Sequence, residues 1–301
     1  MAVENSPARI GKTIVICGEV KGQEDLVLIP LLVLWVNPVL AQTSSGRGVA
    51  APPLTGQALV EGALANELSA AEDVSHPMRY QLRKTNPRGI TTKEIMETRD
   101  GEVARLIAIN DQPLSSADEA TEDARLNALL GDPAKQRRRK QAEDDDTGRA
   151  LNVLRALPSA FLYRDAGPGE GPTGKVEKFA FRPNPAFTST DLETEVLPAM
   201  AGEIWIDPVH LRVARLDAHL QQDVDFGWGI LGRLNKGGWI VIEQADVSGG
   251  QWRTVRFAMQ MSGRVVFKNR VFDTTEVQTN YAPLPAGMSY EKAIEILLSG
   301  K

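Results

Sequence analysis

A series of short apolar segments between residues 175 and 281 most constrains what this chain can fold into. Each segment is rich in strand-forming residues, and turn pairs such as Asp207-Pro208 and Lys236-Gly237 separate them. Short strands at this spacing, with no helical pattern between them, are typical of an antiparallel meander. The segments are KVEKFAF, GEIWID, LRVARLDAHL, GWIVIEQADV, QWRTVRFAMQM and RVVFKNRVFDTTEVQTNY.

The alternation within these segments predicts one apolar and one polar face. In QWRTVRFAMQM one face carries Val255, Phe257, Met259 and Met261, and polar side chains dominate the other. In LRVARLDAHL the apolar positions change parity near residues 214–215. An extra residue in one strand produces such a change, so we predict a β-bulge there and a curved sheet.

Helices and a hairpin are predicted on both sides of this series. Leucines and alanines near helical spacing indicate an amphipathic helix within residues 56–75, and SYEKAIEILLSG predicts a terminal helix closed by Gly300. Asp100-Gly101 lies between two strand-like runs, which is a strong hairpin signal. The glycine-rich stretch 167–174 is interpreted as a loop.

Residues 115–148 form a charged insert that differs in composition from the rest of the chain. A basic block at residues 137–140 is followed by an acidic block at 143–146. A nucleic-acid arm or an acidic metal cluster is less favoured than an exposed or partly disordered helix, the least ordered part of the chain after the leader. The apolar stripe of residues 151–161 then predicts a packed helix, kinked or ended by Pro158.

The apolar run from Leu26 to Leu40 predicts export. It is shorter than the about 20 residues of a membrane span, and Ala41 follows it in the manner of a signal-peptide cleavage site. We therefore expect residues 1–41 to be a signal peptide, residues 42–55 a flexible leader, and the mature chain to be periplasmic or secreted, without an integral membrane span. The alternative is that the apolar run of residues 26–40 is a buried core segment of the folded protein. Because the single cysteine, Cys17, precedes the cleavage site, the mature chain has no thiol.

Two glycine motifs do not have the context that their chemistry needs. Residues 227–232 fit G-x-G-x-x-G, but residues 235–238 break any helix that could present amides to a pyrophosphate. Residues 169–175 nearly fit the phosphate-binding pattern G-x-x-x-x-G-K-[ST], but Val176 stands where the pattern needs a hydroxyl. We therefore expect no nucleotide cofactor.

Other catalytic and polyanion-binding patterns are also lacking in the sequence. The three histidines, His76, His210 and His219, do not have the spacing of zinc ligands, and no nucleophile motif is present. The net charge of −5 disfavours nucleic acid as a partner. The sequence therefore predicts a non-enzymatic protein without a metal or cofactor.

Methionine and aromatic side chains are concentrated in the strand region. They are either ordinary core or the lining of a cavity for an apolar ligand, because flexible methionines repack around ligands of varied shape. The candidate ligand-binding residues are Trp205, Trp228, Trp239, Val255, Phe257, Met259 and Met261.

The segments GEIWIDPVHLRVARLDAHL, DVDFGWGILGRLNKGGWIVIEQADV and QWRTVRFAMQM resemble bacterial exported proteins of the outer-membrane lipoprotein-sorting type, relatives of the LolA/LolB half-barrel carriers. The resemblance implies an α+β domain over residues 56–301: a strongly curved antiparallel sheet, an incomplete barrel, with helices packed on its concave side. It implies a carrier for a lipid, acyl chain or lipoprotein, which we expect to be monomeric. This chain lacks the lipoprotein cysteine of the LolB branch, so a soluble periplasmic form is implied. The alternative is an envelope interaction or sensing module that shares the fold and binds no lipid.

Overall fold

The computed structural model describes residues 56–226, 231–265 and 268–300, and in that part of the chain thirteen strands form one open antiparallel sheet. The strands are β1 Met78–Asn86, β2 Gly89–Met96, β3 Val103–Ile109, β4 Gln112–Pro113, β5 Phe161–Gly171, β6 Gly174–Pro183, β7 Met200–Asp207, β8 Arg212–Leu220, β9 Val224–Phe226, β10 Gly232–Leu234, β11 Trp239–Asp246, β12 Trp252–Val265 and β13 Lys268–Pro283.

The order of the strands places the first and the last described strands, β1 and β13, next to each other in the sheet. The main path runs β4-β3-β2-β1-β13-β12-β11-β8-β7-β6-β5, and the short strands β9 and β10 pair beside β12. The N-terminal strand β1 pairs with β2 on one side and with the C-terminal strand β13 on the other. The sheet does not close, so it has the predicted form of an incomplete barrel with helices on its concave side.

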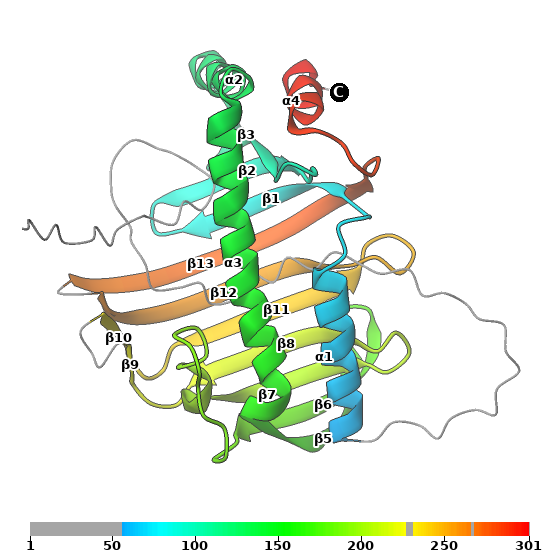
Figure 1. The fold of residues 1–301 in the computed structure, drawn as a ribbon, viewed down its shortest axis with the longest axis vertical. Coiled ribbons are helices and arrows are strands. Elements are labelled where there is room, and N and C mark those ends of the chain that lie inside the picture. The colour runs from blue at the N-terminus through cyan, green and yellow to red at the C-terminus, as the bar shows by residue number, and fades with distance from the viewer. Residues whose placement is uncertain (1–55, 227–230, 266–267, 301) are drawn as a thin grey trace, which may run out of the picture.

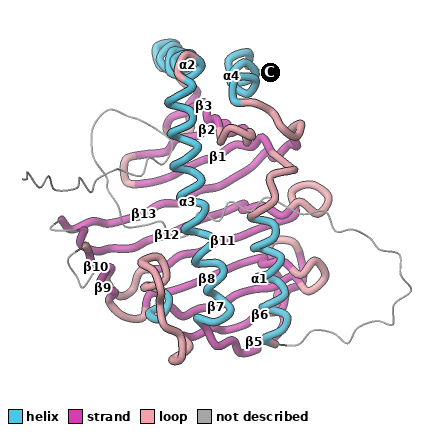
Figure 2. The backbone as a smooth tube through the Cα atoms, in the orientation of Figure 1, coloured by secondary structure: helices cyan, strands magenta, loops and turns pink. Residues whose placement is uncertain are grey.

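The helices of the described residues are α1 Gln57–Ala71, α2 Ser116–Leu130, α3 Pro133–Ala160 and α4 Tyr290–Ser299, with a 3-10 turn η1 at Leu197–Ala199. Helices α1 and α3 lie across one face of the strands (Figure 1), which we call the concave face. They run beside each other over the strands (Figure 2). Helices α2 and α4 lie together at the end of the sheet formed by β1–β3 (Figure 1).

The main hydrophobic core fills the layer between the concave face and these two helices. Helix α1 contributes Leu59, Val60, Ala63 and Leu64, and the C-terminal half of α3 contributes a second apolar stripe that includes Leu154. The strands contribute residues from β5 to β12. Burial of this layer provides the main driving force for helix docking, because apolar area removed from water contributes about 25 cal/mol per Å².

Several elements agree with the prediction from sequence. The bulge expected near residue 214 is present, because Trp205 pairs with Arg215 and Ile206 with Val213, which leaves Ala214 as the extra residue. Residues 97–102, with Asp100-Gly101, connect the antiparallel pair β2 and β3. Helices α1 and α4 form where expected, and α4 ends at Gly300 with a left-handed φ of 68°.

Three expectations need correction. Residues 167–174 are not a loop: β5 extends to Gly171 and pairs with β6, and an edge strand tolerates Pro168. The segment RVVFKNRVFDTTEVQTNY is not one strand, because β12 ends at Val265 and β13 begins at Lys268.

The charged insert 115–148 is helical, as expected, and the third correction concerns its order, because polar contacts hold it to the rest of the fold. It forms α2 and the first half of α3, which the Asp132 side chain caps. The low apolar content of the insert suggested disorder, but its polar side chains have distant partners in the fold. The Gln136 amide, for example, donates to the carbonyl of Asp100 at 2.7 Å.

Candidate functional site

Three of the predicted ligand-binding residues form a continuous row on β12. Phe257, Met259 and Met261 alternate along the strand and belong to the main core beneath α1 and α3. They are 7%, 7% and 1% exposed. A row of one aromatic and two methionine side chains gives this part of the concave face an adaptable apolar floor.

The floor is bounded by charge on the same face of the sheet. Phe257 lies directly opposite Glu276 on β13, and Glu276 lies opposite Lys84 on β1. The ammonium of Lys84 and the carboxylate of Glu276 are 2.9 Å apart. Since residues directly opposite in an antiparallel pair share a face, the concave face passes from an apolar surface to an ion pair within two strands.

Two of the predicted tryptophans lie elsewhere, which corrects the expectation that they line one cavity. Trp205 lies between Ile204 and Ile206, which are core residues, so its indole faces the opposite, convex side. Its ring lies 4.0 Å from the Lys178 Nζ and 5.1 Å from the Arg215 Cζ. Trp239 likewise alternates with core residues on β11, and its indole nitrogen donates to the side chain of Gln260.

Of the remaining two candidates, Val255 differs from the expected row and Trp228 is not described. Val255 lies at a second bulge, because Glu243 pairs with Arg256 while Gln244 pairs with Thr254. The extra residue breaks the alternation, and Val255 is only partly buried. Trp228 lies outside the described residues.

Helix α3 covers the concave face and is held differently at its two ends. Its C-terminal half buries an apolar stripe, Ala150, Val153, Leu154, Leu157 and Ala160. Its N-terminal half is held by polar contacts with the β2–β3 turn: Gln136 donates to the Asp100 carbonyl, and Glu143 accepts from the Glu102 N–H at 3.1 Å. Gly148 lies between the two halves, exposed, with open space where a Cβ would stand.

A buried carboxylate attaches α1 to the sheet. Glu67 accepts two hydrogen bonds from the guanidinium of Arg212, at 2.8 and 3.0 Å, and one from the Val213 N–H at 2.9 Å. The Gln244 amide donates to the same carboxylate at 3.1 Å. The charge and the acceptor oxygens of the Glu67 carboxylate are matched there, as a buried ion pair requires.

A second buried carboxylate, Glu97, lies at the junction of the N-terminal strands with β12. It accepts from the Met78 N–H at 2.8 Å, and the Arg253 guanidinium is 3.9 Å away. Burial raises the pKa of Glu97 to about 7, although Arg253 and the Met78 N–H favour the charged form, and Glu143 on α3 adds to the rise. A carboxyl group with this pKa changes charge near neutral pH.

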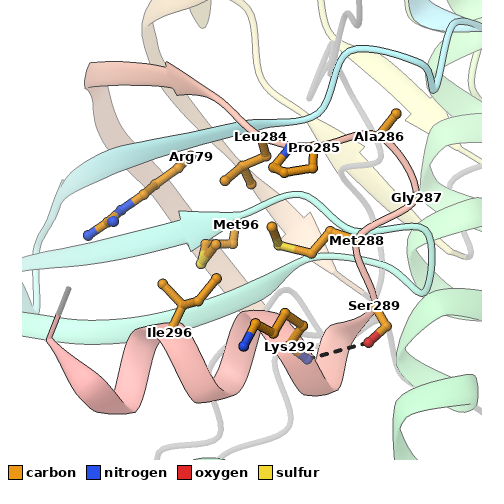
Figure 3. A pocket seen from close by; sticks show the side chains of 10 residues that line it. All are labelled: Arg79, Met96, Leu284, Pro285, Ala286, Gly287, Met288, Ser289, Lys292 and Ile296. Carbon is orange, nitrogen blue, oxygen red and sulfur yellow. Dashed lines mark hydrogen bonds between the residues drawn. The ribbon is translucent and has the colours of Figure 1, made fainter.

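An open groove of about 470 Å³ lies on the convex face between β1, β2 and α4. Figure 3 shows Met96, Leu284, Met288 and Ile296 converging there, with Lys292 of α4 beside them. The full lining is Arg79, Met96, Leu284, Pro285, Ala286, Gly287, Met288, Ser289, Lys292 and Ile296. The face is assigned by strand pairing, because Arg79 lies opposite Met96 and alternates on β1 with Tyr80, which shares the concave face with Lys84.

This groove was not predicted from the sequence. Its residues come from β1, β2, the segment 284–289 and α4. From the sequence, each of these segments is assigned separately to a strand, a joint or a helix, so their side chains are not brought together. The signal in the sequence was weak: Met288 follows a proline-rich joint, and Ile296 is next to the predicted apolar stripe of the terminal helix.

Comparisons with known proteins give one structural match. A scan against protein-family models finds no match, and a search of the curated proteins finds none. Among solved structures, the chain is similar to the crystal structure of a "putative outer membrane lipoprotein-sorting protein domain" from Vibrio parahaemolyticus. Identity is 12%, the TM-score is 0.26, and the match covers 79% of this chain and 99% of the other. At that TM-score the likeness carries no argument, so function is argued from the residues of this chain.

Searches for metal sites and membrane helices were negative in the described part of the chain. No group of three or more histidine, cysteine or acidic side chains is arranged to hold a metal ion among residues 56–226, 231–265 and 268–300. None of the helices in these ranges has the length and hydropathy needed to cross a membrane.

Proposed function

We propose that this protein is a non-enzymatic binding protein of the cell envelope that carries an acyl chain or another apolar ligand. The ligand would lie in the layer between the concave face and helices α1 and α3. The observation that carries the proposal is the row of Phe257, Met259 and Met261, a pliable apolar floor that ends at the Lys84–Glu276 ion pair. An apolar surface bounded by charge suits an amphiphile, a molecule with an apolar tail and a polar head.

Helix α3 supplies a way in for the ligand. The floor residues are buried, so a ligand reaches them only when part of their cover moves. The N-terminal half of α3 is held by polar contacts with the β2–β3 turn, and when that half lifts these groups can bond to water, which an apolar stripe cannot do. In this proposal that half of α3 lifts, and its C-terminal half stays docked.

Mass spectrometry of organic extracts tests the proposal directly. Protein purified from its native envelope should yield a lipid or acyl compound at near one molecule per chain. The control is the same extraction from protein that has been unfolded in urea, washed and refolded, which should yield none. Extracts that contain no apolar compound in either case would contradict the carrier function.

A reversible cross-link tests the opening of α3. An ideal Cβ at Gly101 would lie 3.3 Å from the Lys140 Cβ, close to the Cβ separation of about 3.5–4.5 Å in disulfides. Because the φ of 95° at Gly101 strains any side chain there, and its Cβ would stand 2.8 Å from a Glu143 carboxylate oxygen, rates are compared only between the two redox states of one variant. The variant Gly101→Cys with Lys140→Cys should bind a fluorescent fatty acid at least about tenfold more slowly when oxidised than when reduced. Each single-cysteine variant is the control and should not respond to the oxidant. Equal rates in both redox states would exclude this motion of α3.

The close burial of the β12 row also favours a second function, an envelope interaction module with a filled core. The variant Met259→Ala separates the two functions. A ligand layer predicts little loss of stability and weaker binding of the fluorescent fatty acid, whereas a filled core predicts a loss of about 2–5 kcal/mol in unfolding free energy. Arg256→Ala, on the opposite face, is the control for binding. Urea unfolding and titration of the probe give both quantities, and a large loss without any binding by the unmodified protein would favour the interaction module.

A further inference from the structure

The groove on the convex face is a separate feature from the concave layer, with a lining of its own chemistry. Its floor and walls are apolar: Met96 is fully buried beneath it, and Leu284, Met288 and Ile296 stay partly exposed around it. Its volume of about 470 Å³ lies within the about 300–1,000 Å³ typical of small-molecule sites. Apolar side chains that stay exposed in a concave site leave surface that a ligand can cover.

The backbone around the groove favours a hydrocarbon chain over a peptide. The Leu284 N–H donates to the Pro77 carbonyl at 2.8 Å, and the Met288 N–H donates to the Pro285 carbonyl at 3.3 Å. The Met288 carbonyl accepts from the Arg99 N–H at 3.1 Å. A bound peptide would need partners for its own amide groups, whereas a hydrocarbon chain needs none.

The charges that line the groove favour an anionic group at one end of the ligand. The lining contains two cationic side chains, Arg79 and Lys292, and no acidic one. Arg79 pairs with Glu94 on the sheet, and Lys292 pairs with Glu295 at 2.9 Å on the surface of α4. Lys292 and Glu295 are 62% and 61% exposed, and an ion pair at such a site is weak and exchangeable. A ligand carboxylate can therefore compete with Glu295 for Lys292.

We propose that this groove binds a free long-chain fatty acid, with its hydrocarbon chain against Met96, Met288 and Ile296 and its carboxylate at Lys292. This site is distinct from the proposed ligand layer on the concave face, and the inference does not depend on that layer. The proposal requires only one hydrocarbon chain in the groove. The open rim leaves the carboxylate in contact with water, and a surface cation is then sufficient to orient it.

Calorimetric titration of the purified protein with dodecanoic acid tests this site, with dodecanol as the uncharged comparison. Lys292→Gln should weaken binding of the acid about threefold, and Glu295→Gln should strengthen it by a similar factor, because it releases Lys292 from its pair. Neither variant should change binding of the alcohol. Both positions are well exposed, so these substitutions leave the fold intact.

Two further variants locate the ligand. Ile296→Trp fills the groove and should weaken binding of the acid by about tenfold or more, while Arg256→Ala, outside the groove lining, should leave it unchanged. Circular dichroism of each variant confirms folding. No binding of the acid, normal binding by Ile296→Trp, or equal effects of Lys292→Gln on acid and alcohol would each overturn the inference. Loss of acid binding in Met259→Ala alone would also overturn the inference, and it would support binding in the concave layer instead.

Discussion

Glu67 connects a helix to the sheet through one buried carboxylate, and its loss should be costly. In Glu67→Ala the guanidinium of Arg212 stays buried without its partner, so we expect the unfolding free energy to fall by about 3–5 kcal/mol. Glu61→Ala, at an exposed position on the same helix, is the control and should change it by less than about 0.5 kcal/mol. Urea unfolding monitored by tryptophan fluorescence measures both. Similar small losses in the two variants would show that α1 docks by apolar burial alone.

The raised pKa of Glu97 predicts that stability depends on pH. Because burial raises this pKa to about 7 in the folded chain, the folded state keeps a proton that the unfolded chain loses near pH 4.5. The associated stability is complete below pH 4.5 and is lost as the pH rises to about 7. From the size of the shift, we expect a loss of about 3 kcal/mol over that interval.

The variant Glu97→Gln isolates this effect. The amide keeps the shape of the side chain but does not titrate, so the difference in unfolding free energy between the unmodified protein and the variant should fall as the pH rises from 4.5 to 7. Above that range the difference should be constant. A difference that does not change with pH would mean that the carboxyl group is charged throughout. Urea titrations at a series of pH values provide the measurement.

Two glycines, Gly148 within helix α3 and Gly202 within strand β7, offer a matched test of opposite sign. Gly148 lies mid-helix with open space at its Cβ position, so Gly148→Ala should raise the unfolding free energy by about 1 kcal/mol. At Gly202 on β7 a Cβ would stand 1.9 Å from the Asp217 carbonyl oxygen, so Gly202→Ala should lower it by at least about 2 kcal/mol. Thermal or urea unfolding distinguishes the signs. A loss of stability in Gly148→Ala would mean that α3 is not a regular helix at that point.

Elements whose pattern is local were predictable from sequence, and elements that depend on distant partners were not. The bulge at Ala214 shifts the apolar parity of its strand and was visible. The bulge at Val255 was not, because Val255 continues the apparent apolar alternation of Phe257 and Met259. The polar half of α3 was expected as an exposed or partly disordered helix, and its docking was not predicted, because its contacts with the β2–β3 turn join residues far apart in the chain.

The candidate sites followed the same rule. The row on β12 could be predicted because Phe257, Met259 and Met261 alternate within one strand. The tryptophans were grouped by residue type alone, and the strand register places Trp205 and Trp239 on the other face. The convex groove could not be predicted, because its residues come together only when β1 pairs with β13 and α4 packs beside β2.

At the scale of the whole molecule, export is the prediction that lies outside the described residues. The apolar run that ends at Leu40 and the small residue Ala41 predict a mature chain that begins at Gln42. N-terminal sequencing of protein from fractionated cells should find this start in the envelope fraction. A substitution such as Leu32→Arg within the run should retain the precursor in the cytoplasm. An intact residue 1–41 segment on cytosolic protein would contradict export and the proposed site of action.

The pairing of β1 with β13 has a consequence for how the chain folds. Met78 pairs with Pro283, and Thr85 with Thr275, so this seam joins segments from opposite ends of the described chain. Such distant pairings are slow to form because the intervening loop must first be closed. During synthesis β1 emerges long before β13 and lacks this neighbour until residues 268–283 have left the ribosome. A polypeptide that completes its sheet last stays unfolded for longer, and an unfolded chain is the form that a secretion channel threads.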